Sequence, residues 1–166
     1  EVIAIDYLPK LGVFWGYPLA FSKSFSAFAL IAMLLGYLVG IATIPKMISQ
    51  RQALIVNVCL AAALVGVALF TKGMLSIACI IMLSFAHAIM WPAIWPLSIH
   101  DLGRHTELAS GLLVMAIAGG AVMPLIYSRL CENFGNQYAY ILLFVSYAYI
   151  LFFAVYGYKI KTKESQ

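Results

Sequence analysis

Three side chains at helical spacing are the residues of this sequence best able to bind a polar molecule. His87, Trp91 and Trp95 recur every four residues within the uncharged stretch 74–99. A lipid-facing helix gains nothing from an imidazole and two indoles on one face, since buried polar groups need partners. We therefore expect this face to line a polar pathway through a membrane. At about 100° per residue, three serines share the same face: Ser76, Ser84 and Ser98.

The chemistry of this face favours a sugar ring as its ligand. Pro92 frees the carbonyl of Ala88 and Pro96 frees that of Pro92, so both carbonyls can accept hydrogen bonds from a ligand. Flat indole faces beside hydrogen-bonding groups match the apolar C–H faces and hydroxyl rims of sugars. The alternative is that the tryptophans are interfacial anchors. It applies most to Trp95, which is only four residues from Ile99.

Two carboxylates stand on the apolar segment that opens the chain. Glu1 and Asp6 lie within EVIAIDYL, which we interpret as the last turns of a truncated span because it begins without Met inside an apolar run. Carboxylates inside a membrane carry protons or hold ligands. If the segment is instead the outer end of its helix, both are simply solvated. Glu1 is the stronger candidate for a binding residue.

Catalysis and metal binding find no support in the sequence. His100 and His105 lie in a polar loop and have no usual zinc spacing. No nucleophile, phosphate-binding or metalloprotease motif occurs. We therefore expect a protein that is not an enzyme and uses no cofactor or metal.

The composition predicts a membrane protein with several spans. Hydrophobic residues make up 64% of the chain and charged residues 10%, with a mean hydropathy of +1.00. Soluble domains carry about 25% charged residues. The net charge of +4 comes from basic residues scattered in loops, which is typical of membrane topology rather than of nucleic-acid binding.

The predicted fold is an all-α, polytopic membrane helical bundle. Residues 9–24 mix glycine, proline, lysine and aromatic residues, and we predict an interfacial loop there. The segment 1–8 is the end of a first, truncated span. The complete predicted spans are 25–44, 53–70, 74–99, 108–128 and 138–158.

Small residues predict where helices approach closely or bend. Gly36 and Gly40 lie four residues apart with Ala32, a spacing that lets another helix come close. Gly119 and Gly120 precede Pro124, whose missing N–H frees the carbonyl of Gly120, so a bend is expected there.

The distribution of basic residues predicts the orientation. One side of the membrane would hold six of them and the other side four, which places the C-terminus in the cytoplasm of a cell whose inner (plasma) membrane holds the protein. The six are Lys46, Arg51, Arg104, Lys159, Lys161 and Lys163, and the four are Lys10, Lys23, Lys72 and Arg129.

Several stretches resemble the fucose:proton symporter family, which belongs to the major facilitator superfamily and includes glucose/galactose permeases. The run WPAIWPLSIHDLG at 91–103 is similar to the tenth helix of that family. The stretch 110–124 resembles its eleventh helix, 36–50 its eighth helix and following loop, and Glu1-Val2 with Asp6 its seventh helix. Ala93 and Trp95 stand where the family commonly has Thr and Phe. Other departures are Ser128, Cys131 and Glu132.

The resemblance implies the C-terminal six-helix half of a twelve-helix transporter. It implies secondary active transport of a hexose of the glucose, galactose or fucose type, coupled to protons, by alternating access. The expected partners are the hexose, the proton, the lipid bilayer and an N-terminal six-helix half that carries the proton-coupling carboxylates. His87, Trp91, Trp95 and Glu1 would line the pocket. The alternatives are a major facilitator transporter of a non-sugar solute and a non-transporting membrane subunit.

Overall fold

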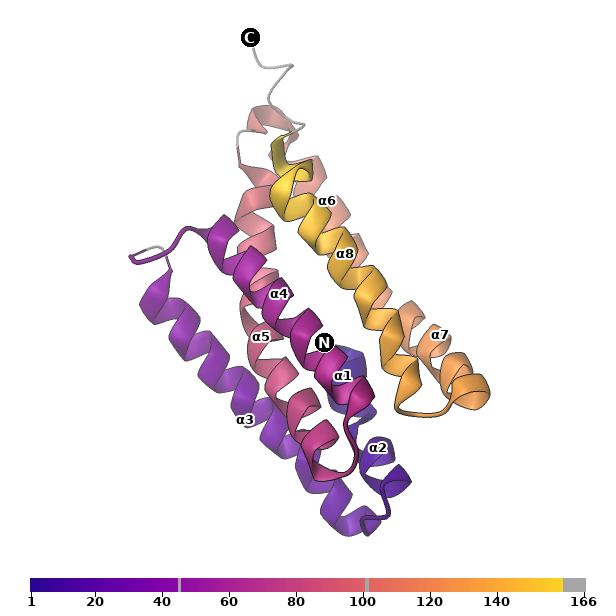
Figure 1. The fold of residues 1–166 in the computed structure, drawn as a ribbon. Helices are drawn as coiled ribbons and strands as arrows, with labels where there is room; N and C mark the ends of the chain where they lie inside the picture. The colour runs from indigo at the N-terminus through magenta and orange to yellow at the C-terminus, as the bar shows by residue number, and fades with distance from the viewer. Residues whose placement is uncertain (45, 101, 160–166) are drawn as a thin grey trace.

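The computed structural model describes residues 1–44, 46–100 and 102–159, and within these ranges the chain forms helices and no strand (Figure 1). The elements are α1 (Val2–Asp6), α2 (Leu8–Phe14), α3 (Leu19–Thr43), α4 (Gln50–Phe70), α5 (Met74–Ile99), η1 (Gly103–His105), α6 (Thr106–Ala116), α7 (Gly119–Phe134), η2 (Tyr138–Ile141) and α8 (Leu142–Val155).

Helix α5 lies at the centre of the bundle. It packs along α3 and α4, and α4 in turn packs against α8 (Figure 1). Leu83 and Ala86 of α5 are fully buried between these neighbours. Among the described residues, five segments are long and apolar enough to cross a membrane, counting Gly103–Phe134 and Tyr138–Lys159 as one span each.

Local sequence signals set where helices α4 and α5 begin. At the start of α4, Ser49 and Gln52 form a capping box, which satisfies free N–H groups of the first turn. The turn to α5 needs Gly73, whose φ of 62° is a conformation that favours glycine. Ser76 then donates a hydrogen bond to the carbonyl of Ala68 at 2.8 Å, which ties α5 back to α4.

The close approach of α3 to α5 depends on glycine. A Cβ added at Gly36 would lie 2.5 Å from the carbonyl oxygen of Phe85 and 2.8 Å from Cβ of Ala88. At Gly40 it would lie 3.1 Å from Ile89. The absence of side chains on this ridge therefore allows the two backbones to come together.

The prediction of a loop at 9–24 is wrong. Its residues 9–14 form α2 together with Leu8, and α3 already begins at Leu19. Pro9 lies in the first turn of α2, where its missing N–H costs nothing. Gly12 then lets α3 pack closely, since a Cβ there would lie 2.6 Å from Oγ of Ser22. Tertiary packing outweighs the low helix propensity of glycine.

The segment expected as one span at 108–128 forms two helices. Helix α6 ends at Ala116 and α7 begins at Gly119, so the break comes just before the glycine pair. Through the break the chain tightens, with Ala118 donating to Met115 and Gly120 donating to Ile117. Pro124 lies inside α7 and removes the N–H that would bond to Gly120, which weakens this end of the helix.

The remaining spans differ from their predicted bounds by a few residues at the ends. The span predicted at 53–70 begins three residues earlier, and the one at 138–158 opens with the 3₁₀ turn η2. The span predicted at 74–99 coincides with α5. Lys161 and Lys163, which contribute to the predicted orientation, lie outside the described residues.

Candidate functional site

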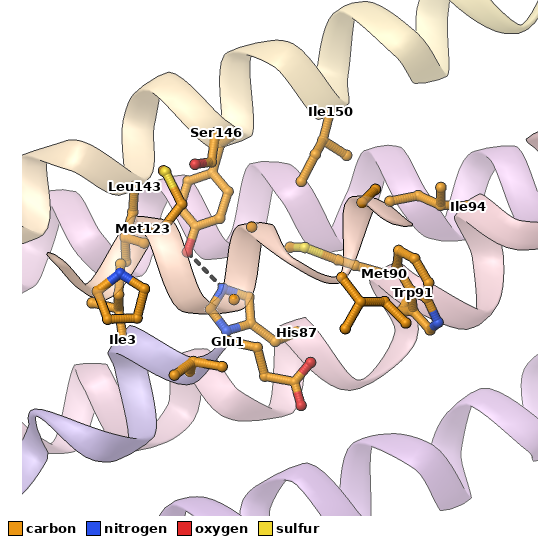
Figure 2. A pocket seen from close by; sticks show the side chains of 17 residues that line it. Glu1, Ile3, His87, Met90, Trp91, Ile94, Met123, Leu143, Ser146 and Ile150 are labelled. Carbon is orange, nitrogen blue, oxygen red and sulfur yellow. Dashed lines mark hydrogen bonds between the residues drawn. The ribbon is translucent and has the colours of Figure 1, made fainter. Parts of the chain in front are cut away.

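A cavity of about 520 Å³ lies between α1, α5, the α6–α7 break and α8. Figure 2 shows side chains from these elements converging on it. Its lining is mainly apolar, with Met90, Ile94 and Met123 among the contributors. The volume and lining are those of a site for a small molecule. The α5 residues that line it all lie in the second half of that helix, between His87 and Ile94.

A hydrogen-bonded pair forms the polar part of the wall. The Nε2 atom of His87 lies 2.7 Å from the hydroxyl oxygen of Tyr147, and both side chains line the cavity (Figure 2). Both are almost fully buried, with 5% and 4% of their surface exposed. The other ring nitrogen of His87, Nδ1, is buried and has no hydrogen-bond partner among the described residues. A buried polar atom of this kind normally has a hydrogen-bond partner.

The two tryptophans of α5 are placed differently. Trp91 is 38% exposed and lines the cavity one turn beyond His87. Trp95 packs edge-to-face on Trp91, with ring centroids 5.8 Å apart, and does not belong to the lining. Trp91 therefore presents its indole to the cavity, whereas Trp95 lies behind it and contacts Trp91.

Glu1 provides the charged side chain of the cavity lining within the described residues. It is exposed, unlike His87, and it lies on the same cavity as the imidazole in Figure 2. Asp6, the other carboxylate of the opening segment, is exposed and is not part of the lining. Of the two acidic residues, the structure brings only Glu1 to the cavity.

The broken helix forms a second wall. Ala116, Ile117, Gly119 and Gly120 line the cavity where α6 gives way to α7, and Pro124 lines it one turn later. A Cβ at Gly119 would meet nothing within 4 Å, and at Gly120 only Val2 at 3.8 Å. These two glycines thus leave open space and irregular backbone beside the cavity, as the discontinuous helices of transporters do. The glycines of α3, in contrast, allow close packing.

The serines predicted on the face of His87 do not share its surroundings. Ser76 is buried and bonds to α4, so it holds helices together. Ser84 is fully buried, and its hydroxyl has no partner among the described residues. Neither residue belongs to the cavity lining. The arc on the helical wheel is therefore divided along its length, and only its middle reaches the cavity.

Sequence reasoning missed Tyr147 and Ser146, which line the cavity from α8. A signal was present, because both polar groups lie in the middle of an apolar span, where an interfacial anchor has no use. The hydrogen-bond partner of Tyr147, His87, is sixty residues away in the sequence. No local pattern links the two.

Comparison with known proteins identifies the architecture. No protein-family model matches the chain. The crystal structure of FucP, a major facilitator superfamily transporter in the outward conformation, superposes with a TM-score of 0.87 at 22% identity, covering 92% of this chain and 37% of FucP. A second structure, of the E. coli fucose:proton symporter FucP, gives a TM-score of 0.85 over 92% of this chain and 38% of that one, also at 22% identity. The chain therefore has the fold of part of a major facilitator transporter.

Curated relatives of this major facilitator half are transporters rather than enzymes. It is 33% identical over 109 residues to a glucose/galactose transporter of Brucella abortus, covering 66% of this chain and 26% of that protein. It is 34% identical over 91 residues to a putative glucose/galactose transporter of Helicobacter pylori, covering 55% and 22%. The chain spans about a quarter of the length of these relatives. Together with its apolar helices, these relationships make it a multi-pass membrane protein.

Proposed function

We propose that the protein containing this chain takes up a hexose, glucose or galactose, by secondary active transport. The observation that carries the proposal is the cavity of about 520 Å³ in which the exposed indole of Trp91 lies one turn from the His87–Tyr147 pair. An aromatic face beside hydrogen-bonding groups matches a sugar ring. The glucose/galactose transporters related in sequence support the same substrate class.

The proposal includes coupling to protons and alternating access. A neighbour with the same fold is a fucose:proton symporter, and major facilitator halves rock about a site at the bilayer midplane. In the proposed cycle an N-terminal half closes the cavity from the opposite side. Gly36 and Gly40 keep α3 and α5 packed as one body, while Gly119, Gly120 and Pro124 allow the α6–α7 segment to bend. The proposed location is the inner (plasma) membrane with the C-terminus in the cytoplasm.

Uptake of labelled glucose and galactose into proteoliposomes holding the full-length protein tests this proposal. We expect uptake that rises when a proton gradient is imposed. Trp91→Ala is expected to lower uptake by about tenfold to a hundredfold, since a buried aromatic contact of about 1.5–3 kcal/mol is lost. Trp95→Ala provides the matched comparison and is expected to lose less. Folding of both variants is checked by gel filtration in detergent.

The two alternatives give different results in the same assay. A transporter of a non-sugar solute would take up no labelled hexose, and an excess of free hexose would not compete with its solute. A non-transporting membrane subunit would show no uptake of any solute that the proteoliposomes are offered. Normal hexose uptake by Trp91→Ala would remove the proposed binding role of this indole.

A further inference from the structure

The His87–Tyr147 pair is the most specific polar feature of the cavity. It joins α5 to α8 across 60 residues of sequence through a 2.7 Å contact between Nε2 and the phenolic oxygen. The ring planes are inclined at 48° with centroids 5.8 Å apart, so the rings meet at their polar edges rather than by stacking. The contact fixes the orientation of the imidazole and occupies one of its two nitrogens.

The remaining nitrogen of the ring, Nδ1, is enclosed beside the cavity. Nδ1 of His87 is buried without a partner among the described residues, although the ring lines an open cavity. In the interior of a protein such a nitrogen normally has a hydrogen-bond partner. Trp91 flanks it one turn along α5, and Met90 and Met123 supply apolar surface nearby. The surroundings therefore fit a molecule that has both an apolar face and a hydroxyl group.

The same geometry permits two hydrogen-bond patterns. A neutral imidazole has one N–H donor and one acceptor nitrogen, and a phenol can donate or accept. When Tyr147 donates to Nε2, Nδ1 carries the proton and donates to the ligand. When Nε2 donates to Tyr147, Nδ1 accepts from the ligand. The heavy atoms need not move between these two arrangements.

We propose that Tyr147 is a positioning residue that holds His87 in place. In this orientation Nδ1 forms a hydrogen bond, as donor or acceptor, with one hydroxyl group of the sugar ring. The inference rests on the proposed hexose transport and specifies its selectivity. A sugar hydroxyl can both donate and accept a hydrogen bond, so it can pair with Nδ1 in either arrangement. An analogue that lacks the hydroxyl leaves Nδ1 buried and unpaired, which such a site penalises strongly.

Competition by monodeoxy-hexoses tests the inference in proteoliposomes holding the full-length transporter. The wild type is expected to bind one monodeoxy analogue of glucose about 10- to 100-fold more weakly than glucose, and the others nearly as well. Tyr147→Phe keeps the ring and removes the hydroxyl. We expect it to reduce this discrimination to about threefold or less and to raise KM about tenfold, with the maximal rate changed by less than about threefold.

Tyr149→Phe is the matched control. Tyr149 lies on the same helix and is 74% exposed, so the wild-type discrimination should persist in this variant. If Tyr147→Phe fails gel filtration, His87→Gln is measured instead, and loss of the same discrimination is expected. Discrimination that survives in the folded variant overturns the inference alone. Absence of hexose uptake by the wild type and by Tyr149→Phe overturns the proposed function, and the inference with it.

Discussion

The most apolar windows of helix α5 and of the segment Gly103–Phe134 have the same mean hydropathy of 2.0 and differ strongly in burial. In α5, 61% of the most apolar window is buried inside the chain, whereas none of the window in Gly103–Phe134 is buried. Both segments line the cavity: α5 is the well-buried wall, and Gly103–Phe134 is the exposed one. Hydropathy therefore identifies a span without indicating how much protein surrounds it.

Small and polar residues account for the difference. Along α5, the backbone meets the glycine ridge of α3, and Ser76 bonds to α4. The α6–α7 segment has glycines too, but a Cβ at Gly111 or Gly119 would meet nothing within 4 Å. In lipid, helices associate through close packing and hydrogen bonds rather than through hydrophobicity. Glycine favours association only where a second backbone reaches it.

The largest effect expected from this comparison is that of Leu83→Ala. Leu83 is fully buried in α5, so removing its side chain leaves a cavity and should lower the free energy of unfolding by about 2–5 kcal/mol. Leu112→Ala in α6 changes a side chain that is 58% exposed and should cost less than about 0.5 kcal/mol. Unfolding by SDS in mixed micelles measures both.

The same two variants are also compared in the full-length protein. Equal costs for Leu83→Ala and Leu112→Ala would contradict the contrast in packing within the intact protein. Such an outcome would mean that protein outside this chain packs on the face of α6 that carries Leu112. The cost of Leu83→Ala, whose side chain is buried within this chain, is the reference for that comparison.

A smaller loss is expected from Gly36→Ala. The added methyl group would lie 2.5 Å from the carbonyl oxygen of Phe85, a backbone atom that cannot move easily. Forcing α3 and α5 apart should cost about 1–3 kcal/mol. Gly111→Ala is the matched control, because the same methyl group meets open space there and alanine is the better helix former. If the two variants unfold at the same temperature, α3 and α5 do not pack closely at Gly36.

How much the sequence could predict also differs between these two regions. The bounds of α5 follow from an uncharged run between Gly73 and His100, and the helical arrangement as a whole follows from apolar runs of membrane length. The break in the α6–α7 segment, between Ala116 and Gly119, is close to the bend expected near Gly120 from Pro124. Helix α2 was missed because Gly12 is a poor helix former and packs only in the context of α3.

The cavity was predictable on one side only. His87 and Trp91 stand out because imidazole and indole groups are unusual at the depth of a membrane. Tyr147 is the partner of His87, but tyrosine is common in the last span and its pairing depends on how α8 packs. Trp95 has the same spacing as Trp91 and does not line the cavity. Periodicity locates a face, whereas tertiary packing decides which part of it is hollow.

The smallest effect concerns how the exposed segment is held to the bundle. The hydroxyl of Tyr7 donates a 3.1 Å hydrogen bond to the carbonyl of Pro124, joining the start of the chain to α7. Tyr7→Phe keeps the edge-to-face contact with Tyr127 and removes this bond, so the free energy of unfolding should fall by about 0.5–1.5 kcal/mol. Tyr149→Phe changes an exposed hydroxyl and should cost nothing measurable. Hydrogen exchange of the α7 amides should rise in Tyr7→Phe and stay unchanged in α5, because the lost bond loosens only the weakly packed side. A rise of equal size in both helices would show that the two regions open together, and the contrast between them would then hold for burial but not for local stability.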